Sequence, residues 1–152
     1  MATLNDDEVY QSFYQEALQK PMPWFPMDSD FMRDVKIRRL ALCGGWDYIG
    51  KYAAFIACLA AVDGHIYDVS DDFGWACVRS DMSVVGCEIS DDEIREFIGV
   101  LLKLELLDNE MYDEDFKLCC ERMVKNAEEY AASVAGGKTK AYKARKGKAA
   151  AR

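Results

Sequence analysis

Residues 24–61, WFPMDSDFMRDVKIRRLALCGGWDYIGKYAAFIACLAA, contain the most apolar stretch of this chain and decide how the remainder is organised. Asp34 is a good N-cap for a first helix, and the pair Gly44 and Gly45 predicts its end, because glycine tolerates the left-handed backbone that ends helices. A second helix is expected to begin at Asp47, with apolar side chains at helical spacing. A helix this apolar must be surrounded by the rest of the fold.

The composition is that of one compact domain with appendages. The chain has 152 residues, of which 51% are hydrophobic, enough for a substantial core. No apolar run approaches the roughly 20 residues of a membrane span. The acidic N-terminus has neither the basic start nor the apolar core of a signal peptide. We therefore expect a cytoplasmic protein without a membrane partner.

Charge is distributed unevenly along the chain, whose net charge is −8. Residues 136–152 contain seven basic side chains and no acidic one: Lys138, Lys140, Lys143, Arg145, Lys146, Lys148 and Arg152. The remaining 135 residues therefore hold 12 basic and 27 acidic side chains, a net charge of −15. This asymmetry is typical of an acidic globular body with a basic arm. We predict that the basic tail is disordered.

Cysteine and histidine could hold a metal, but their pattern argues against a metal site. The six cysteines include no C-x-x-C pair and the chain has a single histidine, so the usual Cys/His zinc spacings cannot be built. We expect reduced and mostly buried thiols, and predict no structural disulfide, no metal and no cofactor.

Residues 1–22 are expected to form an N-terminal amphipathic helix and a proline-rich link. Asn5 can cap the helix, and Phe13 and Tyr14 belong to an apolar face that is typical of a packing surface. We expect this face to pack against the body of the protein or against a second copy.

Three elements are predicted after the apolar helix. Residues 65–69 alternate as in a short strand, and Ser70 is expected to cap the next helix, with Phe73 directed inward. A helix over residues 90–104 is better specified. Ser90 caps it within a capping box, and apolar residues recur along one face.

The C-terminal part of the chain predicts a hairpin and a long helix. Residues 106–112 are expected to form the hairpin, and residues 114–135 the helix. Its apolar positions are spaced alternately by four and three residues, and Phe116, Met123 and Tyr130 are every second one of them. That spacing fits either a short coiled coil between two copies or packing against the body. Together with the N-terminal aromatic residues, these three are the predicted oligomerisation residues.

The order F-P-x-D-x-D-F, D-x-K-I-x-x-L, a glycine, Y-I-G-x-Y and an apolar helix resembles the N-terminal domain of phage replisome organisers. These are DnaD-like replication initiation proteins of Gram-positive bacteria and their phages. The matching residues are Phe25, Pro26, Asp28, Asp30, Phe31, Asp34, Lys36, Ile37, Leu40, Gly45, Tyr48, Ile49, Gly50 and Tyr52. The resemblance implies a mainly helical winged helix-turn-helix domain over residues 23–113, with the predicted hairpin as its wing, in a bacterial host cell.

No catalytic pattern emerges from the sequence. The segment from Gly45 to Lys51 matches the start of a phosphate-binding loop, but Tyr52 stands where that motif needs a hydroxyl for magnesium. We interpret the segment as a turn between helices. His65 has no nucleophile or orienting carboxylate placed beside it by a motif. The protein is therefore not expected to be an enzyme.

DNA binding is the activity that the resemblance implies, yet the helix predicted over residues 90–104, which would be the recognition helix, is acidic. Phosphate contact requires clustered lysine and arginine. Two basic patches meet this requirement: the tail, and a smaller patch of Arg33, Lys36, Arg38 and Arg39. The tail is the stronger candidate, because its seven cations could contact phosphates without reading sequence.

The leading hypothesis is a non-enzymatic accessory of phage-type DNA replication initiation. In this hypothesis the basic tail contacts DNA, and the acidic winged helix contacts replication proteins such as a helicase loader and forms homo-oligomers. One alternative is a dimeric winged-helix transcriptional regulator. Another is an acidic inhibitor of a host DNA-binding factor.

Overall fold

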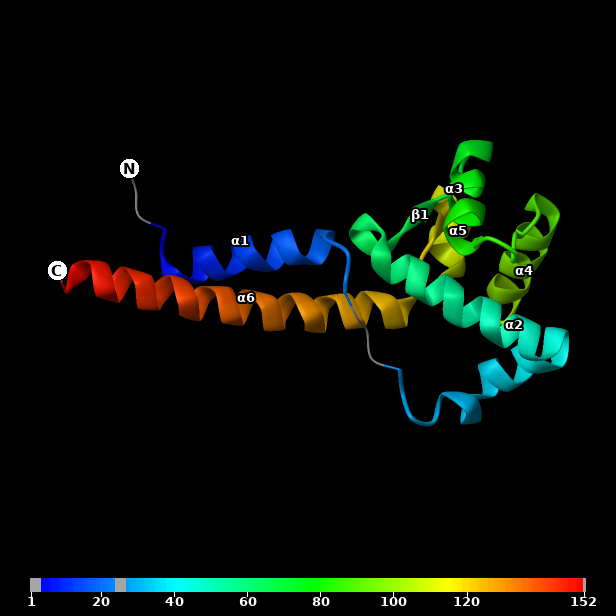
Figure 1. Ribbon diagram of the computed structural model, residues 1–152, viewed down its shortest axis with the longest axis horizontal. Helices are drawn as coiled ribbons and strands as arrows, with labels where there is room; N and C mark the ends of the chain where they lie inside the picture. Colours follow the sequence, from blue (N-terminus) through cyan, green and yellow to red (C-terminus); the bar gives the residue numbers. More distant parts are fainter. Residues whose placement is uncertain (1–3, 24–26, 152) are drawn as a thin grey trace.

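The computed structural model describes residues 4–23 and 27–151 and arranges helices around a small two-stranded sheet (Figure 1). The chain divides into a body, residues 27–120, and an arm made of the first helix, α1 (Asp6–Gln19), and the last, α6 (Glu121–Ala150). In Figure 1 the arm projects from the body, with α1 lying along α6. Among the described residues, these two helices make the most extensive contact between any two elements.

The central helix, α2 (Val35–Ala61), confirms the predicted pair of helices. A short 3-10 turn, η1 (Phe31–Arg33), precedes it, and Asp34 then caps α2 by accepting hydrogen bonds from two backbone N–H groups, one of them that of Lys36 at 2.7 Å. Gly45 has φ 62° and ψ −150°, outside the helical region, and kinks α2 into two segments. The turn between helices that we predicted for Gly45 to Lys51 is therefore confined to Gly45, and residues 46–51 are helical.

The body continues through a second 3-10 turn, η2 (Asp63–His65), into β1 (Tyr67–Asp68). β1 pairs antiparallel with β2 (Lys117–Leu118), with Tyr67 opposite Leu118. The predicted strand near residue 67 is confirmed. Its partner, however, lies in a segment that we predicted to be helical.

The next helix, α3 (Asp72–Met82), begins one residue later than predicted. Its N-cap is Asp71, whose Oδ1 accepts from the Gly74 backbone N–H at 2.9 Å, whereas Ser70 donates its hydroxyl to Asp68. The inward assignment of Phe73 is wrong, since its side chain is 76% exposed. The neighbouring positions Trp75 and Val78 face the core instead.

Helix α4 (Asp91–Lys103) confirms the best-specified prediction. The Ser90 hydroxyl accepts the backbone N–H of Glu93 at 3.1 Å, and the expected apolar face is buried. Within the described residues only this half of the predicted capping box forms. α4, α3, the sheet and the start of α6 surround the second half of α2. The largest fully buried side chains of this core are Leu40, Phe55, Leu59, Val78, Ile94, Phe97, Ile98, Leu101, Leu118, Cys119 and Met123.

The predicted hairpin of residues 106–112 is wrong. Asp108 caps a short helix there, α5 (Asn109–Asp115), by accepting the backbone N–H of Met111 at 3.0 Å. Aspartate favours a helix N-cap as well as a turn, and here the helix forms. Phe116 ends α5 in the left-handed conformation and is 51% exposed. The prediction that it belongs to a long helix is therefore wrong.

The prediction of a disordered tail is also wrong, because α6 continues without a break from Glu121 to Ala150. Gly136 and Gly137, expected to end the helix, lie inside it. The tail is rich in alanine and lysine, which have high helix propensity. α1 supplies a packing partner that covers Ala135 and Thr139 on α6. Tertiary packing is what makes such a helix stable.

α1 confirms the predicted N-terminal helix and packs on α6 of the same copy. Asn5 and Glu8 form a complete capping box, with hydrogen bonds of 2.8 and 2.9 Å. Phe13 and Tyr14 are half-buried, and Met123 belongs to the core of the body. Contact between two copies through these residues stays a prediction.

Candidate nucleic-acid interface

The basic end of α6 carries two kinds of cation. The first kind is paired with acidic residues of α1: Lys143 Nζ lies 2.9 Å from Asp6 Oδ2, and Lys138 Nζ lies 3.7 Å from Glu16 Oε2. Lys138 also lies over the ring of Phe13, 5.4 Å from its centroid. These two lysines are already paired with α1, so they are less free to meet a phosphate than the sequence predicted.

The pairing also affects Glu16 itself. Its pKa is lowered, first by a hydrogen bond from Lys20 and then by the charge of Lys138. Our sequence-based predictions did not pair the acidic residues of α1 with any cation. Their cationic partners on α6 were missed, although opposite charges on two helices that share one packing face were the available signal.

The second kind of cation is free. Lys140, Arg145, Lys146 and Lys148 are exposed and have no ion pair within the part of the chain that the structure describes. An α-helix turns by about 100° per residue, so these side chains point to several sides of α6 and form a cationic rod. Arg152 lies outside the described residues.

The smaller predicted patch lies at the other end of the molecule. The start of α2 and the end of α6 are widely separated along the long axis in Figure 1, so the structure does not bring the two patches together. Lys36 donates to the Glu105 carbonyl at 2.7 Å, and Arg38 donates to the Met32 carbonyl. Arg33 and Arg39 are exposed.

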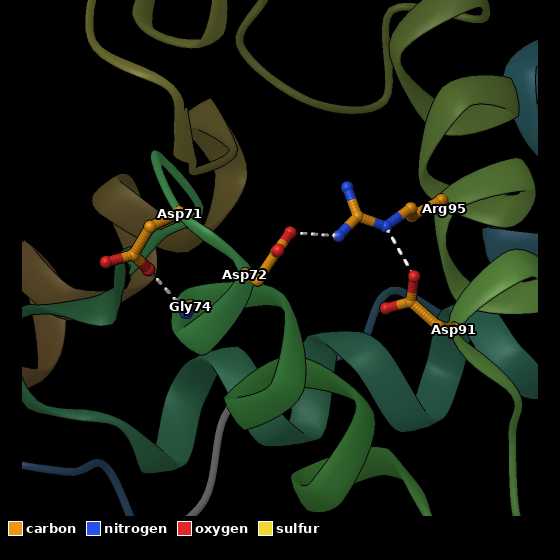
Figure 2. A network of polar contacts seen from close by, with 5 residues as sticks. All are labelled: Asp71, Asp72, Gly74, Asp91 and Arg95. Carbon is orange, nitrogen blue, oxygen red and sulfur yellow. Dashed lines mark hydrogen bonds and ion pairs between the residues drawn. The ribbon is translucent and has the colours of Figure 1, made fainter.

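The surface formed by α3 and α4 is acidic, and its cation Arg95 is already bound to two aspartates. Arg95 donates to Asp91 at 2.8 Å and to Asp72 at 3.1 Å (Figure 2). Its guanidinium also lies 4.7 Å from the centre of the Trp75 ring. These contacts join the starts of α3 and α4, and they leave Arg95 poorly placed to contact a base.

The described residues contain no group of three or more histidine, cysteine or acidic side chains that could hold a metal ion. His65 is 2% exposed, and its Nδ1 lies 3.2 Å from the Leu59 carbonyl oxygen. Six free cysteines are present. Burial raises the pKa of Cys119 to about 11, which makes it a poor nucleophile. Cys43 and Cys87 are exposed, contrary to the expectation of mostly buried thiols.

The body of the protein matches a known family. Residues 24–123 match the family model described as "Lin1244/Lin1753-like, N-terminal". The chain belongs to this family. Neither the search of curated proteins nor that of solved structures gave a match. Among the described residues, no helix is long and apolar enough to cross a membrane.

The Lin1244/Lin1753-like region coincides with one part of the fold. It covers the body and only the first turn of α6, whereas α1 and the basic end of α6 lie outside it. The matched region thus contains the acidic surface of α4, and the free cations of the arm are additional to it.

Proposed function

We propose that this protein is a non-enzymatic accessory of DNA replication initiation, of the replisome-organiser type, that contacts duplex DNA through the tip of its arm. The carrying observation is the set of free cations on one exposed helix end: Lys140, Arg145, Lys146 and Lys148. Phosphate neutralisation dominates affinity for DNA and requires such side chains. Their distribution around the helix favours contact with the backbone over the reading of bases.

The acidic body supports the same division of labour. Asp92, Glu93 and Glu96 are exposed on α4, where they repel a phosphate backbone. The tip of the arm lies far from this surface (Figure 1). A duplex at the tip therefore avoids most of the repulsion from the body.

The proposed place in replication rests on the residues that resemble replisome organisers. Most of them lie in η1 and α2 and form part of the core or the kink, including Phe31, Leu40 and Gly45. We propose that the body is a variant of the winged helix. The order α2, β1, α3, α4 and β2 supports this proposal, with α5 in the position of the wing. In this role the body contacts replication proteins, such as a helicase loader, and a second copy.

A dimeric transcriptional regulator is the second candidate, because α3 and α4 are consecutive packed helices as in a helix-turn-helix motif. The acidic surface of α4 and the bound state of Arg95 count against reading of the major groove. A footprint on one palindromic sequence would favour the regulator over the accessory.

The test is the affinity for a labelled duplex as a function of salt concentration. About four phosphate contacts give a slope of about −3.6 in log affinity against log salt, at roughly 0.9 for each contact. A variant with alanine at the four free cations should lose both the binding and the slope. Its helix should persist, since alanine is the best helix former.

The matched control replaces the paired lysines, Lys138 and Lys143, with alanine. This variant removes two cations from the same helix but should lower DNA affinity much less. Equal loss in both variants would contradict the assignment to the free cations. Tight binding by the four-alanine variant would contradict a DNA contact at the arm.

A further inference from the structure

A groove lies on the body where the second half of α2 faces the loop between α3 and α4. Its volume is about 640 Å³. Trp46, Gly50 and Ala54 line one side and are spaced four residues apart, so they share one face of α2. Val84 and Ile89 from the loop line the other side. The small residues at 50 and 54 leave room beside the large indole ring.

The apolar groups at this groove are unusually open to solvent. Trp46 is 78% exposed, Val84 62% and the adjoining Val85 fully exposed. Contiguous exposed apolar surface marks an interaction site, and tryptophan is among the residues that contribute most to binding energy at interfaces. This surface therefore has the composition of a docking site.

The rim of the groove determines the charge of the partner. Asp47, Glu88 and Glu93 line it, and Lys51 is its one cation within the described residues. Lys51 is already bound to Asp47, with Nζ 2.7 Å from Oδ2. The hydrogen bond that Lys51 donates to Asp47, and then the charges of Asp47 and Glu93, raise the pKa of Lys51 against the effect of burial. The rim thus keeps a surplus of negative charge.

Two occupants that this chain could supply fit the groove poorly. A second copy docked face to face would bring the same acidic rims together. The basic end of α6 from another copy has the right charge. Around its free cations, however, it offers mainly alanine to an apolar groove. The fitting occupant combines larger apolar side chains with basic flanks.

We propose that the groove binds an amphipathic helix of a partner protein, whose apolar face packs on Trp46 and whose lysine or arginine flanks face Glu88 and Glu93. A helix laid in an apolar groove is a recurring mode of peptide recognition. Opposite charges at the rim select the partner. The inference deepens the protein-contact part of the proposed function and does not depend on the DNA contact of α6.

The experiment measures binding of three labelled peptides to the full chain by fluorescence anisotropy. The first peptide is a designed helix with leucine along one face and lysine on both flanks. The second has the same leucines with glutamate flanks, and the third is residues 138–152 of this chain. We expect the lysine-flanked peptide to bind, and to bind about tenfold or more tightly than either of the others.

Three variants locate the site. Trp46→Ala removes the main apolar contact, Glu93→Lys reverses the rim, and Gly50→Leu fills the groove, where an added Cβ meets open space. Each should weaken the first peptide by about tenfold or more. The control is Phe73→Ala, which removes a 76% exposed aromatic ring that does not line the groove, and it should bind like the wild type.

The outcomes separate this inference from the DNA contact. Trp46→Ala and Gly50→Leu should leave the affinity for duplex DNA unchanged, so that peptide binding can fail while DNA binding holds, or the reverse. Equal binding of the two leucine peptides, no binding of either, or an unaffected Trp46→Ala variant would overturn the proposal. Binding of the 138–152 peptide as tight as that of the first would identify a second copy as the occupant and also overturn it.

Discussion

The body and the arm of this protein are held together in different ways. The body buries large side chains such as Phe55 and Phe97 around the long helix α2. The arm is a pair of helices whose buried positions include the small residues Ala17 and Ala135, with ion pairs at its edge. Large apolar burial gives the body most of its stability. The arm depends on the close approach of α1 and α6 and on ion pairs between them. We therefore expect α1 to separate from α6 before the body unfolds.

The largest expected effect is in the body, at Gly74. A Cβ at this position would lie 1.9 Å from the carbonyl oxygen of Asp68, so α3 and β1 would have to separate. Gly74→Ala should destabilise the protein by about 3 kcal/mol or more, at the upper end of overpacking effects. The matched control is Gly99→Ala in α4, where the added Cβ meets open space and should stabilise by up to about 1 kcal/mol. Denaturant unfolding of both variants measures the difference.

The next effect separates the arm from the body. Ala135 is fully buried in the arm, and a carboxylate there would be buried without a partner, at a cost of several kcal/mol. Ala135→Glu should release α1, with hydrogen exchange accelerated in α1 and unchanged in α4. Ala141→Glu places the same charge at an exposed position of α6 and should have little effect. Equal protection loss in both helices would mean that arm and body unfold as one unit.

A smaller effect is expected from the cap of α4. Ser90→Ala removes the acceptor for the Glu93 backbone N–H and should cost about 1 kcal/mol. Ser80→Ala, at an exposed position inside α3, serves as the control. A wild-type unfolding midpoint for Ser90→Ala would contradict the importance of this cap.

The smallest effect concerns pH and the arm. The pKa of Glu16 is lowered in the folded protein, mainly by the hydrogen bond from Lys20 and then by the charge of Lys138. A carboxylate with a lowered pKa stabilises the folded state above its unfolded pKa, and this contribution is lost as the pH falls through the folded pKa. We therefore expect the amides of α1 to be less protected at low pH than at neutral pH, once their exchange rates are corrected for the intrinsic pH dependence of amide exchange. A Glu16→Gln variant, which cannot titrate, should show a smaller change.

The sequence predicted the elements whose signals are local. Asn5, Asp34 and Ser90 each cap the expected helix, and Gly45 makes the expected kink, because these features act within one turn of the chain. The predictions failed where contact with a segment distant in the sequence determines the local structure. The pairing of β1 with β2 joins residues some fifty positions apart, and its effect on Phe116 could not be deduced from local spacing.

The candidate interface was predicted in part. The cations of the tail were identified from composition, but their division into paired and free side chains depends on α1, which folds back along α6. The exposed apolar groove was missed, because our sequence-based predictions did not consider the residues that follow Trp46 at four-residue spacing. Its neighbours Gly50 and Ala54, at the same spacing, were the signal that this face lacks the bulk of a core.

The division of labour between body and arm is tested most directly by nuclear magnetic resonance, through the backbone amide signals of the whole chain during titration with a short duplex. Our account predicts shifts concentrated in residues 140–150, which disappear at high salt and are the same for duplexes of unrelated sequence. The signals of α3 and α4 should stay in place. Shifts concentrated in α4, dependent on the sequence of the duplex, would contradict the account and identify the body as the part that reads DNA.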